Sequence, residues 1–96
     1  MAESEYLLRL FIAGDEPNSR LAERNLRGLC TDCLPGRHRI EVVDVLQDFE
    51  AALAAKIMVA PAMVMLAPYH VTLYGTLADK VKVLAAFGLE DPGHGP

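Results

Sequence analysis

The chain has 96 residues and a mass of 10.5 kDa, which is the size of one domain. Apolar residues make up 52% of it and charged residues 23%, a composition typical of a soluble globular protein. Nine basic and thirteen acidic side chains leave a net charge of −4, which argues against nucleic-acid binding through bulk charge. Seven glycines, six prolines and two cysteines exclude the collagen-like, disordered and disulfide-rich classes.

Signals for export or membrane insertion are also missing from the sequence. No stretch reaches about 18 uninterrupted apolar residues, and residues 1–5 are acidic and lack the basic segment of a signal peptide. We therefore expect a cytoplasmic protein in reducing surroundings, without a membrane partner. We expect a single domain over residues 1–96, with an ordered core over 6–89 and a flexible tail over 90–96.

The first half of the chain predicts a strand, a helix and a strand. Residues 6–13 form a nearly continuous apolar block, as in a strand buried on both faces. A helix is predicted from residue 19 to about 34, because its apolar positions share one face and its arginines the opposite one. Residues 38–46 are rich in valine and isoleucine and are interpreted as the second strand.

The second half predicts a short helix, a hairpin and a last helix. Asp48 is a candidate N-cap for a helix from residue 49 to about 57. Pro61 follows and, since a proline inside a strand removes a hydrogen-bond donor, we place it at the start of the third strand and as a candidate cis-proline. Residues 62–67 and 71–74 then form a hairpin.

The last helix is expected to begin at a capping box. Thr76 and Asp79 have the spacing of that motif. One face of the predicted helix is expected to be buried and consists of four residues: Leu77, Val81, Leu84 and Gly88. The complete order is β-α-β-α-β-β-α. It predicts an α/β fold of thioredoxin-like type, a mixed four-stranded sheet with helices on both faces.

Cys30 and Cys33 form a C-x-x-C pair, which in a βαβ context can be a redox centre. A reactive thiolate requires the positive N-terminal end of a helix to lower its pKa, whereas this pair lies near the predicted C-terminal end. We favour two packed cysteines and keep a thiol-redox protein as an alternative. His38 is the nearest further metal ligand, and no catalytic, metal or cofactor site is predicted.

The remaining polar candidates suit binding better than catalysis. Asp44 ends a strand at the carboxyl edge of the sheet, where a turn cap is favoured over a ligand site. Lys56 is the only basic residue in a long stretch and can anchor an acidic partner. A basic stripe on the first helix is either a solvated face or a docking surface: Arg20, Arg24 and Arg27.

Four segments together resemble the KaiB family of bacterial clock proteins. The family pattern is K-L-Y-V-A-G-x-x-P-N-S, then I-D-V-L, then K-I-L-A-T-P. The corresponding segments here are R-L-F-I-A-G (9–14), P-N-S (17–19), V-D-V-L (43–46) and K-I-M-V-A-P (56–61). The resemblance spans residues 6–89, nearly the whole chain.

This resemblance implies binding and not catalysis. KaiB proteins bind the ATPase ring of KaiC, and the ring-bound form recruits further clock proteins such as KaiA. They adopt two folds: a thioredoxin-like, binding-competent form and a tetrameric resting form ordered β-α-β-β-α-α-β. The implied function is that of a clock protein that binds a KaiC-type ring. A stress or signalling adaptor that has lost the clock role is the other alternative.

The resemblance also implies binding residues. Lys56 and its short helix, with Asp48 and Glu50, would face KaiC, and Arg39 and Glu41 on the second strand would meet a further partner. Glu41 replaces a lysine of the family, so its charge is inverted. The family also has an acidic pair where this chain has Ala54-Ala55, and an arginine pair where it has Thr72-Leu73. These differences argue against recruitment of KaiA.

Three residues bear on the choice between the two folds. Pro61 stands where thioredoxin-like folds carry a cis-proline. Ala86 and Gly88 replace a glycine and an aspartate of the family's last helix. Alanine favours a helix interior by about 1 kcal/mol over glycine, and losing an acidic side chain near a helix C-terminus removes about 0.3–1 kcal/mol of unfavourable interaction. We expect a thioredoxin-like resting form and a monomer, with a tetramer only in the alternative fold.

Overall fold

The computed structural model describes residues 5–89, so the predicted flexible tail and residues 1–4 lie outside it. Within this part the elements follow the predicted order: β1 (Tyr6–Ile12), α1 (Pro17–Cys33), β2 (His38–Asp44), α2 (Phe49–Ala54), β3 (Ala62–Ala67), β4 (Val71–Tyr74) and α3 (Lys80–Ala86). The hairpin strands have the predicted bounds. The strands form one mixed sheet in the order β2-β1-β3-β4.

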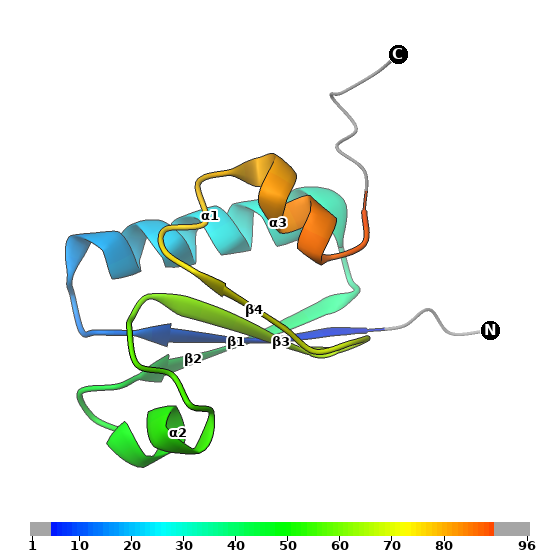
Figure 1. Cartoon of the computed structure of the whole chain (residues 1–96). Helices are drawn as coiled ribbons and strands as arrows, with labels where there is room; N and C mark the ends of the chain where they lie inside the picture. The colour runs from blue at the N-terminus through cyan, green and yellow to red at the C-terminus, as the bar shows by residue number, and fades with distance from the viewer. Residues whose placement is uncertain (1–4, 90–96) are drawn as a thin grey trace.

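The sheet is covered by helices on both faces, as predicted (Figure 1). β1 pairs in parallel with β2, starting with Tyr6 opposite His38, and antiparallel with β3, which in turn pairs antiparallel with β4. α1 and α3 lie on one face and α2 lies alone on the other. The α2 face of the sheet therefore has much less helical cover than the α1 face.

The apolar side chains form two separate cores. The larger core lies between the sheet and the helices α1 and α3, and it includes Leu10, Leu26, Met63, Leu84 and Phe87. A smaller core lies under α2 and is built by Phe11, Val43, Ala52, Ile57, Ala62 and Val64. Successive residues of a strand point to opposite faces, so β1 supplies Leu10 to one core and Phe11 to the other.

α1 begins two residues earlier than predicted, at Pro17. Glu16 is the N-cap, and its carboxylate accepts a hydrogen bond from the Ser19 backbone N–H at 3.0 Å. Pro17 takes the first helical position, where a missing N–H costs nothing. Ser19, which we expected near the helix start, is fully buried, and its hydroxyl accepts from the Ala13 N–H at 3.0 Å. The serine therefore joins the helix to the end of β1.

β2 and α2 both end earlier than the apolar pattern suggested. Asp44 Oδ1 accepts from the N–H groups of Gly14 and Leu46, each at 3.0 Å, and this bends the chain out of the strand. The interpretation of Asp44 as a turn cap is confirmed. Asp48 caps α2 as predicted, accepting from the Ala51 N–H at 3.1 Å. Lys56 has a φ of +59°, and this left-handed residue prevents α2 from continuing to residue 57.

The start of α3 corrects the predicted capping box. Asp79 and not Thr76 is the N-cap, since its carboxylate accepts from the Lys82 N–H at 3.2 Å. Leu77 precedes the helix with a φ of +60° and is buried, whereas Val81 is 58% exposed. The prediction that Leu77 and Leu84 are buried is confirmed, whereas Val81 and Gly88 are exposed, and Val83 and Phe87 complete the buried face in their place. The cis bond before Pro61 is confirmed, and a second one precedes Pro68.

Candidate functional site

The C-x-x-C pair lies at the C-terminal end of α1, where the sequence placed it. Cys30 is fully buried in the larger core, and Cys33 is partly buried. Burial raises the pKa of the Cys30 thiol from 9.0 to about 12, and the neighbouring Cys33 adds to the shift. A thiol of this kind is protonated and shielded at neutral pH, which is the opposite of what a redox nucleophile requires.

The described residues also lack the usual signs of a metal site or a membrane segment. No three His, Cys, Asp or Glu side chains of residues 5–89 come together in a way that would hold a metal ion. No helix in the same range is long and apolar enough to cross a membrane.

Large apolar side chains are exposed around α2. Five of the ten exposed large apolar residues of the described chain lie within residues 46–59, and we call this group the α2 surface: Leu46, Phe49, Leu53, Met58 and Val59. Their exposed fractions run from 54% for Leu53 to 85% for Met58. Contiguous exposed apolar patches are uncommon on monomeric proteins and usually mark a place where another molecule binds.

The α2 surface exists because α2 turns its small residues inward. Ala52 is 4% exposed and packs against the smaller core, while Phe49 and Leu53 of the same helix point to solvent. Ile57 is buried beside Ala52 and holds the segment after the helix in place. A hollow of about 110 Å³ lies between Phe49, Ile57 and Met58. The helix therefore buries alanine and leaves phenylalanine and leucine open to solvent.

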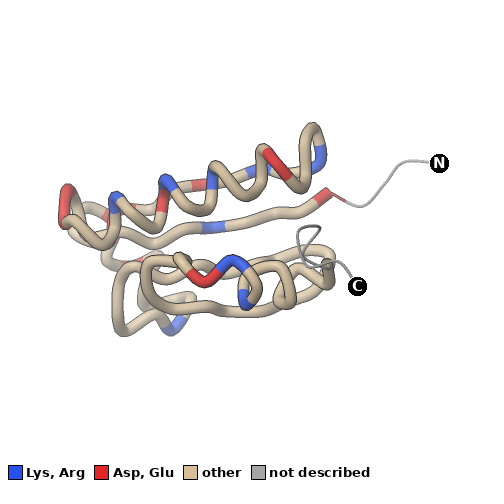
Figure 2. Tube along the Cα trace, turned by 90° about the horizontal axis from the view of Figure 1, so that it is seen from above, with Lys and Arg blue, Asp and Glu red and all other residues tan. Residues whose placement is uncertain are grey.

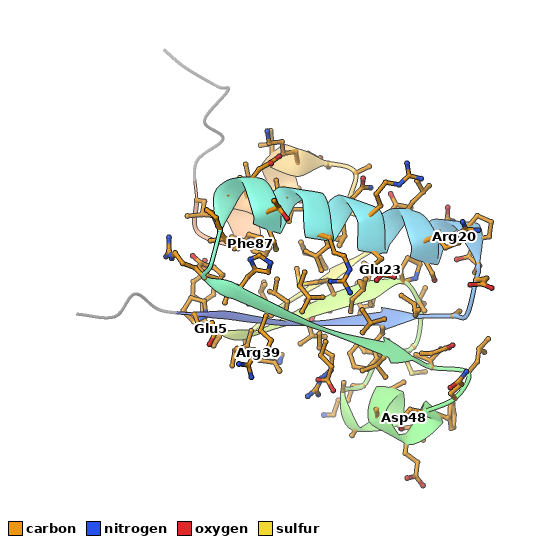
Figure 3. The ribbon with its side chains drawn as sticks, turned by 180° about the vertical axis from the view of Figure 1, so that it is seen from behind. Glu5, Arg20, Glu23, Arg39, Asp48 and Phe87 are labelled. Carbon is orange, nitrogen blue, oxygen red and sulfur yellow. The ribbon has the colours of Figure 1, made fainter. Side chains whose placement is uncertain are left out.

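The three charged residues predicted to face KaiC lie on this segment. Asp48 and Glu50 are exposed at the start of α2, and Asp48 also caps the helix (Figure 3). Lys56 is exposed just after the helix, and its backbone N–H donates to the Leu53 carbonyl at 3.0 Å. Its backbone is left-handed, with a φ of +59°, and it is followed by the buried Ile57 and the exposed Met58.

Two other groups of predicted binding residues lie elsewhere. Arg39 and Glu41 are exposed on β2 at the edge of the sheet. Glu41 forms an ion pair with Arg9 at 2.8 Å, and Arg39 lies 3.9 Å from the Glu5 carboxylate.

Arg20 and Arg24 are exposed on α1. This helix lies on the opposite face of the sheet from α2, with Arg20 labelled in Figure 3. Acidic residues are interleaved with the arginines along this helix (Figure 2), and Arg27 pairs with Glu23 at 2.9 Å. The expected basic stripe is thus partly neutralised. The structure does not bring it together with the α2 surface.

Sequence reasoning missed the apolar residues of the α2 surface. Leu46, Phe49 and Leu53 have helical spacing, which is also the pattern of a buried face. The signal that separates the two cases is the alanine-rich opposite side, which includes Ala52 and Ala55. Alanines permit a close approach to the sheet and leave the large residues outside.

A family model and individual relatives that match this chain carry the same family description. A family model described as the KaiB domain matches residues 9–87. The circadian clock oscillator protein KaiB of Prochlorococcus marinus strain MIT 9313 is 34% identical over 85 residues, covering 88% of this chain and 71% of the relative. The protein of the same description from Rippkaea orientalis is also 34% identical over 85 residues, covering 88% and 82%.

Solved structures confirm the thioredoxin-like fold. The N-terminal domain of Synechococcus elongatus SasA superposes with a TM-score of 0.74 at 18% identity, covering 92% of this chain and 88% of that one. Chloroplastic thioredoxin z gives a TM-score of 0.70 at 17% identity, covering 90% and 80%. Fasciola hepatica thioredoxin gives 0.69 at 18% identity, covering 88% and 82%.

Proposed function

This chain belongs to the KaiB family of circadian clock proteins, and from that premise we propose that it is a non-catalytic regulator that binds the ring of a KaiC-type ATPase. The proposed binding form is the thioredoxin-like fold described above, and the proposed contact is the α2 surface. The observation that carries this proposal is the cluster of large apolar side chains exposed around α2. The buried, high-pKa thiol of Cys30 argues against the thiol-redox alternative.

The α2 surface has the features of a protein interface. Burying one large apolar side chain contributes about 1.5–3 kcal/mol, so a few of them suffice as anchors. Lys56, Asp48 and Glu50 are exposed on the same segment of the chain, and charges beside an apolar contact favour orientation and specificity over raw affinity. Recruitment of a KaiA-type protein is not part of the proposal, because Glu41 inverts the family's charge on β2.

A charge introduced into the α2 surface tests the apolar contact. We expect Leu53→Glu and Met58→Glu to weaken binding to a purified KaiC-type hexamer by at least about 10-fold, which is about 1.4 kcal/mol. Fluorescence anisotropy of a labelled chain measures the affinity. Val81→Glu is the matched control, since Val81 is also an exposed apolar residue (58%) but lies on α3. Equal affinity of the α2 variants and the control would refute the proposal.

The role of Lys56 is tested separately in the same assay. Lys56→Asn removes the charge and introduces a residue type that tolerates the left-handed backbone at this position, whereas Lys56→Glu inverts the charge. We expect Lys56→Glu to weaken binding more strongly than Lys56→Asn. If neither variant changes the affinity, Lys56 lies outside the contact.

A further inference from the structure

We propose that the outer edge of β2 pairs with β2 of a second copy of this chain, antiparallel, so that the two sheets become one. This pairing uses a different surface from the α2 surface and does not depend on the proposed function. Within residues 5–89 no strand occupies the outer side of β2, because the order is β2-β1-β3-β4. Figure 3 looks at the molecule from this side, with Arg39 on the strand nearest the viewer.

The backbone of β2 presents a row of unpaired groups at this edge. At the start of the strand the Arg37 carbonyl accepts from the Tyr6 N–H, and just after its end the Val45 N–H donates to the Ile12 carbonyl, each at 2.8 Å. Both residues are odd-numbered, and the direction of the backbone groups alternates along a strand. The N–H and C=O groups of His38, Ile40 and Val42 therefore point away from β1, toward the open edge.

These outward groups fit two antiparallel registers, because β2 also includes Asp44. In the first, Ile40 lies opposite Ile40 of the second copy and His38 opposite Val42, in hydrogen-bonded pairs. In the second, Ile40 lies opposite Val42 and His38 opposite Asp44, whose carbonyl already accepts from the Gln47 and Asp48 N–H groups. The second register also places Glu41 opposite Glu41, which brings like charges together.

The charged side chains select the first register, with Ile40 opposite Ile40. In it, Arg39 of each copy lies opposite Glu41 of the other, on the face that carries Arg9. These are the pairs without mutual hydrogen bonds, in which the two strands bring their side chains closest together. Glu41 already pairs with Arg9 at 2.8 Å, so each carboxylate would lie between two guanidinium groups.

Charged residues on an edge strand normally prevent self-association, because identical copies bring like charges together. Here the two charges have opposite sign and stand two residues apart, so the same strand is complementary to itself. β2 also lacks the other protective features, since its seven residues contain no proline or glycine and pair with β1 in an unbroken register. The opposite edge, β4, has only four residues.

A charge-swap series with sedimentation equilibrium tests the proposal. An edge contact of this length is small, so we expect a weak dimer that forms toward millimolar protein concentration. Arg39→Glu and Glu41→Arg should each abolish it, because each places like charges opposite one another at positions 39 and 41. A 1:1 mixture of these two variants should restore the dimer, and so should the double variant R39E/E41R. Wild-type protein that stays monomeric, or a dimer that both single variants retain, would overturn the proposal.

A backbone variant and amide exchange locate the contact. Val42→Pro removes an outward N–H and leaves the hydrogen bonds to β1 intact, so a folded monomer is expected. In wild-type protein the amides of His38, Ile40 and Val42 should become protected from hydrogen exchange as the concentration rises. Those of Arg39 and Glu41 should be protected at every concentration. Protection of the outward amides that does not depend on concentration would contradict the register.

Discussion

At the level of single residues, Cys30 shows what burial does to a thiol. Its pKa rises from 9.0 to about 12 in the folded chain, whereas the unfolded chain keeps the ordinary value. The unfolded state therefore releases the thiol proton first, and folding stability is complete below about pH 9 and falls as the pH rises toward 12. The slope from this one group reaches about 1.4 kcal/mol per pH unit.

Cys30→Ala should remove this contribution to the pH dependence. Urea unfolding of both proteins between pH 8 and about pH 11 measures it, and the other titrating groups cancel in the comparison. The variant loses some stability at every pH because the side chain is fully buried. Its free energy of unfolding should nevertheless fall less steeply above pH 9. Parallel pH profiles would show that the thiol titrates normally in the folded chain.

Single polar residues also account for what the sequence did not predict. Ser19 is a residue type that commonly caps helices, but its hydroxyl accepts a hydrogen bond from the Ala13 N–H in the interior. Thr76 and Asp79 are spaced as in a capping box, so either could be the N-cap. Leu77 is buried before the helix, and α3 begins after Asp79, which is the N-cap. Such choices depend on partners that come from tertiary contacts, which a local pattern does not contain.

At the scale of elements, α2 depends strongly on its cap. It has six residues, far fewer than an isolated helix needs in water. Asp48→Ala removes the hydrogen bond to the Ala51 N–H and should cost the helix about 1 kcal/mol. We expect faster amide exchange over residues 51–54 and weaker KaiC binding, with α1 unchanged.

Glu50→Ala is the matched control for the cap. It removes an acidic side chain from the same first turn without removing a hydrogen bond to the helix start. Its effect on amide exchange in α2 should be clearly smaller than that of Asp48→Ala. Equal effects would assign the stabilisation to charge near the helix N-terminus and not to the cap.

The existence and order of the elements could be predicted because hydrophobic periodicity and turn residues report directly on them. The hairpin strands have the predicted bounds, and the N-cap of α2 is confirmed. The element ends differ where one side chain or one dihedral angle stops an apolar run. Asp44 stops β2 in this way and Lys56 stops α2.

At the scale of the whole molecule, the last quarter of the chain forms α3 where the resting fold of the family has a strand. Ala86→Gly costs α3 about 1 kcal/mol. Gly88→Asp places a side chain at a φ of +77°, where a Cβ would come within 2.6 Å of the Tyr69 hydroxyl. We expect the double variant to lose helical chemical shifts over residues 80–86 while β1 and α1 keep theirs.

Gly28→Ala is the control for this double variant. A Cβ at Gly28 meets no atom within 4 Å, and the residue lies inside α1. This change should stabilise the chain by about 0.5–1 kcal/mol and leave the α3 shifts as they are. Unchanged α3 shifts in the double variant would show that Ala86 and Gly88 do not set the resting form.

Only part of the candidate site could be predicted at this scale. Lys56 and its neighbours were placed together because they are close in sequence. Arg20 and Arg24 belong to a helix on the other face of the sheet, and charge alone does not tell which face a helix covers. The apolar part of the α2 surface required the inward packing of Ala52, which depends on the sheet beneath it.

The contact between Tyr6 and Phe87 has a consequence for synthesis of the chain. The Tyr6 hydroxyl donates to the Phe87 carbonyl at 2.8 Å, and the two rings lie 5.6 Å apart. A strand early in the described chain thus binds the end of its last helix segment, across a sequence separation of 81 residues. During synthesis β1 to β4 emerge before α3, so the larger core lacks Leu84 and Phe87 until α3 follows. The tyrosine hydroxyl gains its acceptor only at that point.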